Sequence, residues 1–162
     1  MKSGTKYLIF GIVKLAVFVL LAVFVISLAD RGKMSATPLS EMAQQVTAAA
    51  DLSTMTEGDN QMVRRLYGLE PADYEGIVLY YPADSMDAYE LCIVKLSDLS
   101  QQQAVLDALQ TRVDSQISVF ESYAPESTAL LQNCVLRAEG NYVLLIVADD
   151  TAPVVQAFTD GL

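Results

Sequence analysis

A long apolar segment near the N-terminus constrains this chain more than any other feature. From Tyr7 to Ala29 the only charged side chain is Lys14, and after Lys14 only Ser27 is not apolar. As a helix rising about 1.5 Å per residue, residues 7–29 span roughly 34 Å, enough to cross the hydrocarbon core of a bilayer. We therefore predict a transmembrane helix at 7–29 after a short cytoplasmic stub at 1–6.

Charge is distributed unevenly around this segment. Residues 1–33 carry five basic side chains against one acidic side chain, giving +4, whereas residues 34–162 carry five against nineteen, giving −14. The positive-inside rule then places the N-terminus in the cytoplasm and the acidic part outside the cell membrane. So negative a domain repels phosphate groups, which excludes nucleic acid as a partner and leaves residues 7–29 as the membrane contact.

A cleaved signal peptide is the alternative interpretation of the same segment. Leu15 to Leu28 has the length of a signal-peptide hydrophobic region, and Ser27-Leu28-Ala29 places small residues before a cleavage site after Ala29. Cleavage there would release a secreted domain. The apolar residues at 7–13 lengthen the segment beyond the usual range of about 7 to 15 residues, which favours a retained anchor.

Residues 30–38 lack periodicity and are predicted to be a linker, and residues 39–162 to form one α+β domain. Apolar residues at helical spacing indicate short helices at 39–50 and at 59–66, the second ended by Gly68.

Alternating apolar residues predict two β-hairpins. The first pairs residues 75–81 with 89–96, and the second pairs 134–139 with 142–148 around a tight turn at Gly140-Asn141.

A helix is expected after each hairpin. Asp98 and Gln101 form a capping box for the first of these helices, Asp150 or Thr151 caps the last one, and a short helix at 126–132 follows Pro125. Two ββα units most simply share one four-stranded, mainly antiparallel sheet with helices packed on one face. The face that carries Cys92 would then be the core, and the other face would expose large apolar side chains that something else could cover.

The residue composition excludes several kinds of chemistry. The chain has no His, so it has no Ser-His-Asp or Cys-His nucleophile and no His-ligated metal site. No catalytic residue, cofactor or metal ligand is assigned. Cys92 and Cys134 share the predicted inner face, where they form either a disulfide or two small buried hydrophobes, and their spacing is not that of a C-x-x-C redox pair.

Three kinds of side chain are candidates for ligand binding. Aromatic residues on the strands could bind a peptide or a glycan, although they could also be half-buried packing residues. Arg112 and Gln116, one helical turn apart, could hydrogen-bond a ligand or tie their helix to a loop. The acidic pairs Asp84 with Asp87, Asp149 with Asp150 and Glu57 with Asp59 lack the pattern of a calcium loop, and Asp149 and Asp150 are more simply helix-capping residues. The candidate binding residues are Tyr80, Tyr89, Tyr142, Arg112 and Gln116.

Four segments in this order resemble the bacterial family called domain of unknown function 4358. They are Leu66-Tyr67-Gly68-Leu69 with Tyr74-Glu75, Glu90-Leu91-x-Ile93-x-Lys95, Arg112-x-x-x-Gln116-x-x-x-Phe120 with Tyr123-x-Pro125, and Gly140-Asn141-Tyr142-Val143. The resemblance covers about residues 42–162 and implies a small exported or membrane-tethered protein. Many relatives look like lipoproteins, whereas this chain has no Cys near Ala29 that could accept a lipid. The resemblance supplies no catalytic residues.

Three functions are consistent with these observations. The leading hypothesis is a non-enzymatic, membrane-anchored extracytoplasmic module that binds an envelope protein or glycan through an open sheet face or the tyrosine-bearing hairpin. The alternatives are a carboxylate-based hydrolase of the cell envelope and a structural accessory subunit of an envelope complex. A concave pocket with two converging carboxylates would favour the hydrolase, and a flat apolar sheet face would favour the binding module.

The predicted topology is testable by proteolysis. Because residues 34–162 are expected outside the membrane, protease added to intact protoplasts should digest them. Survival of the domain until the membrane is permeabilised would contradict this topology. The mass of the mature protein separately reports whether residues 1–29 are removed.

Overall fold

The computed structural model describes residues 14, 17–21 and 34–162. Contacts divide the chain into two compact units, residues 1–33 and residues 34–162. In the first unit residues 17–21 are helical, and their apolar side chains are exposed. Among the described residues no helix has the length and hydropathy needed to cross a membrane. Most of the predicted segment at 7–29 lies outside the described residues, as does the cleavage site at Ala29.

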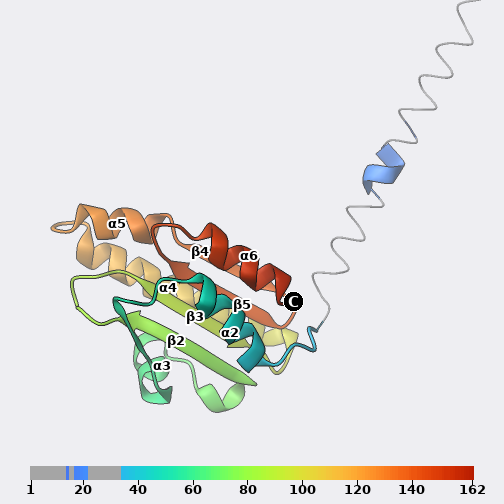
Figure 1. The fold of residues 1–162 in the computed structure, drawn as a ribbon, viewed down its shortest axis with the longest axis horizontal. Helices are drawn as coiled ribbons and strands as arrows, with labels where there is room; N and C mark the ends of the chain where they lie inside the picture. The colour runs from blue at the N-terminus through green and yellow to red at the C-terminus, as the bar shows by residue number, and fades with distance from the viewer. Residues whose placement is uncertain (1–13, 15–16, 22–33) are drawn as a thin grey trace, which may run out of the picture. The chain divides into compact units, whose positions relative to one another are not determined.

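The second unit is an α+β domain built on a five-stranded antiparallel sheet (Figure 1). Along the sheet the strand order is β1-β2-β3-β5-β4. The strands are β1 (Met55–Glu57), β2 (Gly76–Pro82), β3 (Glu90–Lys95), β4 (Val135–Glu139) and β5 (Tyr142–Val147). Both predicted hairpins are confirmed, and β3 pairs with β5 to join them into one sheet. The predicted count of four strands is wrong, because β1 adds a fifth strand at the edge beside β2.

Helices and short 3-10 turns connect the strands. They are α2 (Leu39–Ala49), α3 (Asn60–Tyr67), η1 (Pro71–Asp73), η2 (Leu99–Gln101), α4 (Gln102–Phe120), α5 (Pro125–Gln132) and α6 (Ala152–Asp160). The Asp98–Gln101 capping box forms at the start of η2, which leads directly into α4. Gly68 ends α3 with a φ of 67°, and Gly140 turns the second hairpin with a φ of 55°, a left-handed conformation that a residue with a Cβ adopts only with strain.

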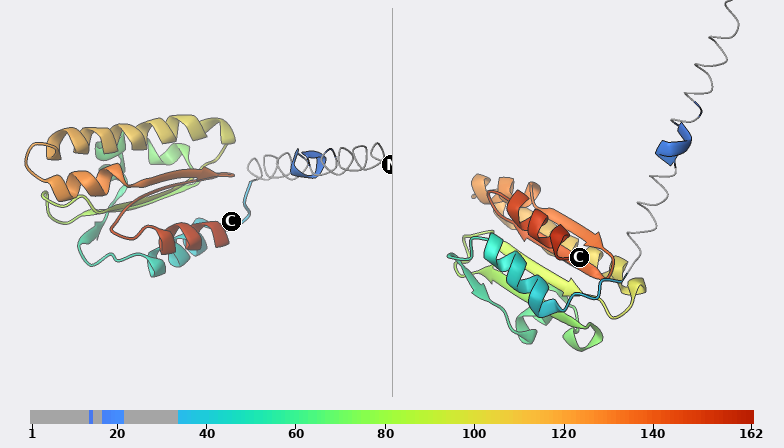
Figure 2. Two further views of the ribbon diagram at one scale, coloured as in Figure 1. Left: turned by 90° about the horizontal axis from the view of Figure 1, so that it is seen from above. Right: turned by 45° about the vertical axis from the view of Figure 1, so that its right-hand side comes forward.

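Helices cover both faces of the sheet, so the prediction that they pack on one face is wrong. Figure 2 shows α4 and α5 on one side of the sheet and α2 and α6 on the other. The first core lies under α3, α4 and α5 and contains the predicted inward residues Cys92, Val94, Val143, Leu145 and Val147. The second core lies under α2 and α6.

The apolar pattern of the two central strands explains the second layer. Leu91 and Ile93 of β3 and Leu144 and Ile146 of β5 face α2 and α6, and all four are fully buried. A single helical layer would leave these four side chains exposed to water, and exposure of apolar surface is unfavourable. The helix after the second hairpin, α6, therefore packs beside α2 and not beside α4.

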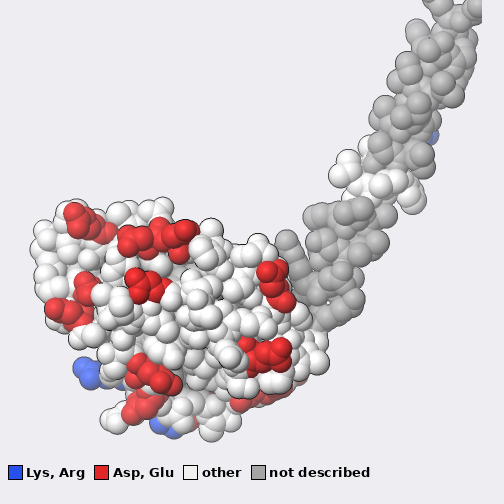
Figure 3. Space-filling view, in the orientation of Figure 1, with Lys and Arg blue, Asp and Glu red and all other residues white. Residues whose placement is uncertain are grey.

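Acidic side chains dominate the outside of this domain. On the face that carries α2 and α6 they are spread over the whole surface, while the basic side chains visible there gather at one edge (Figure 3). This distribution agrees with the charge of −14 carried by residues 34–162.

Truncation of Leu144 tests the second helical layer. Because this side chain is fully buried between β5 and the α2–α6 layer, Leu144→Ala should lower the free energy of unfolding by about 3 kcal/mol. Urea unfolding of the full chain followed by circular dichroism measures the change. Val119→Ala, at a position 55% exposed on α4, is the control and should change stability by less than about 0.5 kcal/mol. Equal, small effects would mean that the face is open.

Candidate functional site

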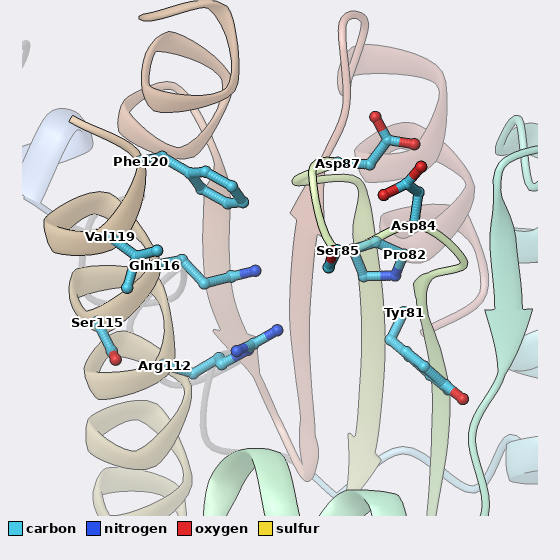
Figure 4. Close-up of a pocket in the computed structure, with 10 residues that line it drawn as sticks. All are labelled: Tyr81, Pro82, Asp84, Ser85, Asp87, Arg112, Ser115, Gln116, Val119 and Phe120. Carbon is cyan, nitrogen blue, oxygen red and sulfur yellow. The ribbon is translucent and has the colours of Figure 1, made fainter. Parts of the chain in front are cut away.

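A pocket of about 250 Å³ lies between α4 and the 83–89 loop that joins β2 to β3 (Figure 4). On one side, α4 extends polar side chains toward the strands. On the other side, the end of β2 and the loop supply a proline, a serine and two carboxylates. The lining residues are Tyr81, Pro82, Asp84, Ser85, Asp87, Arg112, Ser115, Gln116, Val119 and Phe120.

A buried carboxylate beside the pocket holds Arg112 in place. Glu90, the first residue of β3, is fully buried. Its Oε2 accepts hydrogen bonds from Arg112 Nη2 over 3.0 Å and from Arg112 Nε over 3.3 Å. Its Oε1 accepts one from the Tyr67 hydroxyl of α3 over 2.7 Å. These contacts compensate for the loss of water around the carboxylate, which would otherwise cost several kcal/mol.

The same hydrogen bonds leave one edge of the Arg112 guanidinium available. Nε and Nη2 face Glu90, whereas Nη1 makes no hydrogen bond within the part of the chain that the structure describes. The side chain is 21% exposed and extends from α4 toward the middle of the pocket (Figure 4). Arg112 therefore offers donor N–H groups to the pocket, while Glu90 balances its charge.

Gln116, one helical turn after Arg112, carries an unpaired acceptor. The residue is only 7% exposed, and among the described residues its Oε1 is the one buried side-chain polar atom without a hydrogen-bond partner. The end of this side chain that extends into the pocket, on the same side as Arg112, is the amide nitrogen (Figure 4). A buried acceptor without a partner costs about 1–3 kcal/mol. One wall of the pocket thus contains a side-chain amide whose oxygen has no hydrogen-bond partner among the described residues.

The loop opposite α4 is acidic, and it is held by an internal turn and by a contact with α5. Asp84 Oδ1 accepts a hydrogen bond from the Met86 backbone N–H over 2.9 Å, which closes a local turn. Ser127 Oγ of α5 donates to the Met86 carbonyl over 3.3 Å. Asp84 is exposed and Asp87 half-buried, and neither forms an ion pair with a basic side chain among the described residues.

The candidate tyrosines lie away from this pocket. Tyr142 is fully buried in the second core, where its hydroxyl donates to the Thr37 carbonyl over 2.7 Å and burial raises its pKa to about 12. Tyr80 is half-buried at the edge of the same core. Tyr89 donates to Asp149 Oδ2 over 2.8 Å, and this hydrogen bond raises the pKa of Tyr89 above its usual value. The structure therefore brings Arg112 and Gln116 together and separates them from the tyrosines.

Tyr89 and Asp149 line two further hollows, of about 340 and 460 Å³. Carboxylates are the charged groups in both, including Asp51 and Asp150 in the first and Glu126 in the second. Thr151 occupies the N-cap position of α6 without a side-chain capping hydrogen bond, and the carboxylate of Asp150 accepts one from the Ala152 backbone N–H. Within the described residues no cluster of three or more acidic or cysteine side chains is placed to hold a metal ion.

Both cysteines are free thiols. Cys92 is fully buried in the first core, and this burial raises its thiol pKa far above the usual value. Cys134 is half-buried, and the pKa of its thiol is raised for the same reason. Thiolate chemistry is therefore suppressed at both positions.

Sequence reasoning identified Arg112 and Gln116 but missed Glu90 and Tyr67, which orient Arg112. Glu90 occupies the same face of β3 as Cys92 and Val94, so the alternation of that strand already placed a charge at an inward position. A charged residue at a core position of a strand indicates a buried partner. Tyr67 gave no comparable signal, because a tyrosine at the end of an amphipathic helix is common.

Comparison with known proteins agrees with the resemblance found in the sequence. Residues 48–148 match the family model described as Domain of unknown function (DUF4358). The chain belongs to this family. No curated protein and no solved structure matches it. Three of the four segments that carry the resemblance contribute residues that meet beside the pocket: Tyr67 from the first, Glu90 from the second, and Arg112 and Gln116 from the third.

A double-mutant cycle tests the buried ion pair. Arg112→Met leaves the Glu90 carboxylate buried without its cation and should lower the free energy of unfolding by about 3 kcal/mol. Combining it with Glu90→Gln removes both charges, so the double variant should be more stable than the sum of the single effects implies. Urea unfolding of all four proteins gives the coupling free energy. Additive effects would show that the two side chains do not interact.

Proposed function

We propose that residues 34–162 form a peptide-binding module and that the pocket between α4 and the 83–89 loop holds one residue of the peptide. The unpaired, buried Oε1 of Gln116 carries this proposal. An acceptor of this kind is satisfied by an N–H group from a ligand, and its neighbour Arg112 supplies donors on the same helix face.

A peptide group matches these two side chains. Its carbonyl can accept from Arg112 Nη1 and from the Gln116 amide nitrogen, and its N–H can donate to Gln116 Oε1 once rotation about the terminal side-chain bond turns that oxygen to the pocket. Because Glu90, itself held by the Tyr67 hydroxyl, fixes the guanidinium from behind, Arg112 loses little freedom when it binds, which favours affinity.

The size and walls of the pocket also favour this ligand class. At about 250 Å³ the pocket lies just below the usual range for small-molecule sites, about 300–1,000 Å³, and suits one residue of a chain. Val119, Phe120 and Pro82 provide apolar walls beside the polar groups. The chain has no Trp, and the Tyr81 ring extends away from α4 (Figure 4), so α4 faces no aromatic platform for a sugar ring across the pocket.

The binding surface proposed here differs from the open sheet face predicted from the sequence. Leu91, Ile93, Leu144 and Ile146 of that face are covered by α2 and α6, so they cannot contact a partner without unfolding the second layer. The proposed binding surface is therefore the pocket and not the sheet face.

We further propose that residues 7–29 anchor the module in the membrane with the acidic domain outside. The apolar sequence of this segment and the opposite charges on its two sides support the proposal. The five described residues at 17–21 also support it, since they are helical and their apolar side chains are 56–74% exposed.

Peptide binding is testable by NMR titration of the full chain in detergent micelles. The probes are three blocked tripeptides: acetyl-Val-Lys-Val-amide, acetyl-Val-Gln-Val-amide and acetyl-Val-Glu-Val-amide. At least one should shift the side-chain amide resonance of Gln116 saturably. Gln116→Leu should weaken that binding about tenfold, the value of one lost hydrogen bond. The free energy of unfolding should stay equal or rise, because the variant removes an unpaired buried acceptor.

Gln110→Leu is the matched control. Gln110 lies on the exposed side of α4, where its amide donates to Asp114, so this substitution should leave peptide binding unchanged. The proposal fails if none of the three tripeptides binds at millimolar concentration. It also fails if a disaccharide of N-acetylglucosamine binds this pocket in their place.

A further inference from the structure

We propose that the peptide residue inserted in this pocket is a lysine. The inference rests on the proposed function and adds the charge of the bound side chain. It follows from the ionised groups that line the pocket, the apolar walls between them, and the charge of the surrounding surface.

The charges at the pocket do not balance. Arg112 is the one basic residue in the lining, and its charge is compensated by the buried carboxylate of Glu90. Asp84 and Asp87 remain, both on the loop opposite α4 and neither in an ion pair with a described basic side chain. A cationic group in the pocket would therefore meet two carboxylates whose charge is otherwise uncompensated.

The apolar walls suit the stem of a lysine. Val119 and Phe120 of α4 and Pro82 of β2 line the pocket together with the carboxylates. A lysine can bury its four methylene groups along such a surface while its ammonium reaches the acidic rim. Arg112 and Gln116 lie on α4, across the pocket from the loop that carries the carboxylates (Figure 4), where they can bind the main-chain amide of the ligand.

Exposed apolar residues lie in the pocket lining or next to lining residues, and they suit the residues that flank the lysine. Val119, Met86 and Tyr123 are 51–55% exposed, which is unusual for side chains of this size in this domain. Tyr123 packs edge-on against Phe120, with ring centroids 5.7 Å apart, and Met86 lies on the 83–89 loop. Exposed apolar surface therefore occurs on the 83–89 loop and at the end of α4, the two elements that form the pocket.

Long-range electrostatics act in the same direction. With a charge of −14 on residues 34–162, the domain attracts cationic peptides and repels anionic ones, more strongly at low ionic strength. The local carboxylates and the overall field predict the same preference, so the test must separate them.

The experiment compares dissociation constants of the three blocked tripeptides for the full chain in micelles. We expect the lysine peptide to bind at least tenfold more tightly than the glutamate peptide, with the glutamine peptide between them. The double variant Asp84→Asn/Asp87→Asn should reduce the ratio of the glutamate-peptide to the lysine-peptide dissociation constant to about threefold or less. Asparagine at position 84 retains an acceptor for the Met86 N–H, so the local turn is preserved.

The control variant, Asp107→Asn/Asp160→Asn, changes the net charge equally at exposed helix positions outside the pocket. It should keep the tenfold preference for lysine. If the control variant lowers the preference for lysine over glutamate as much as the pocket variant does, the overall field and not the pocket selects the charge of the bound peptide. That result overturns the inference. Equal affinity for the three peptides overturns it while leaving peptide binding intact. Failure of all three to bind rejects the proposed function itself.

Discussion

Burial of strand β3 on both faces is the constraint on which the rest of this domain depends. Every residue of the strand is buried, including the charged residues at its two ends. At the first end the carboxylate of Glu90 forms an ion pair with Arg112 and accepts a hydrogen bond from Tyr67. At the second end Lys95 Nζ lies 2.6 Å from Glu75 Oε2. Since a buried charge without a partner is strongly destabilising, these contacts fix α3, α4 and the segment before β2 relative to the central strand.

The pocket is a consequence of the same constraint. Arg112 must reach Glu90 at the start of β3, and this requirement turns one face of α4 toward the 83–89 loop that precedes the strand. Residues four apart share a helix face, so Gln116 points into the same space. The arrangement places the Arg112 guanidinium and the Gln116 amide side by side in the pocket, on a helix that packs against the first core.

Local signals in the sequence were sufficient for most elements but not for the layers. The alternation of apolar residues with a period of two predicted both hairpins, and Asp98 with Gln101 indicated the start of the long helix. Strand β1 escaped detection because three residues are too few to show alternation. The face that each helix covers was not predictable from helix sequence, since α4 and α6 both carry an apolar stripe. The apolar residues on the outer face of β3 indicated that another element could cover them, and α2 and α6 bury these residues.

Gln116 does not match the apolar packing around it. Val113 and Phe120, its neighbours on the same helix face, are both buried in the first core. An apolar side chain at position 116 would extend that stripe and would need no hydrogen-bond partner. The chain instead carries an amide there, with an oxygen that no group in the described residues satisfies. Since local features that oppose folding stability tend to occur where function requires them, the disagreement between residue and environment at Gln116 points to a ligand more directly than the shape of the pocket does.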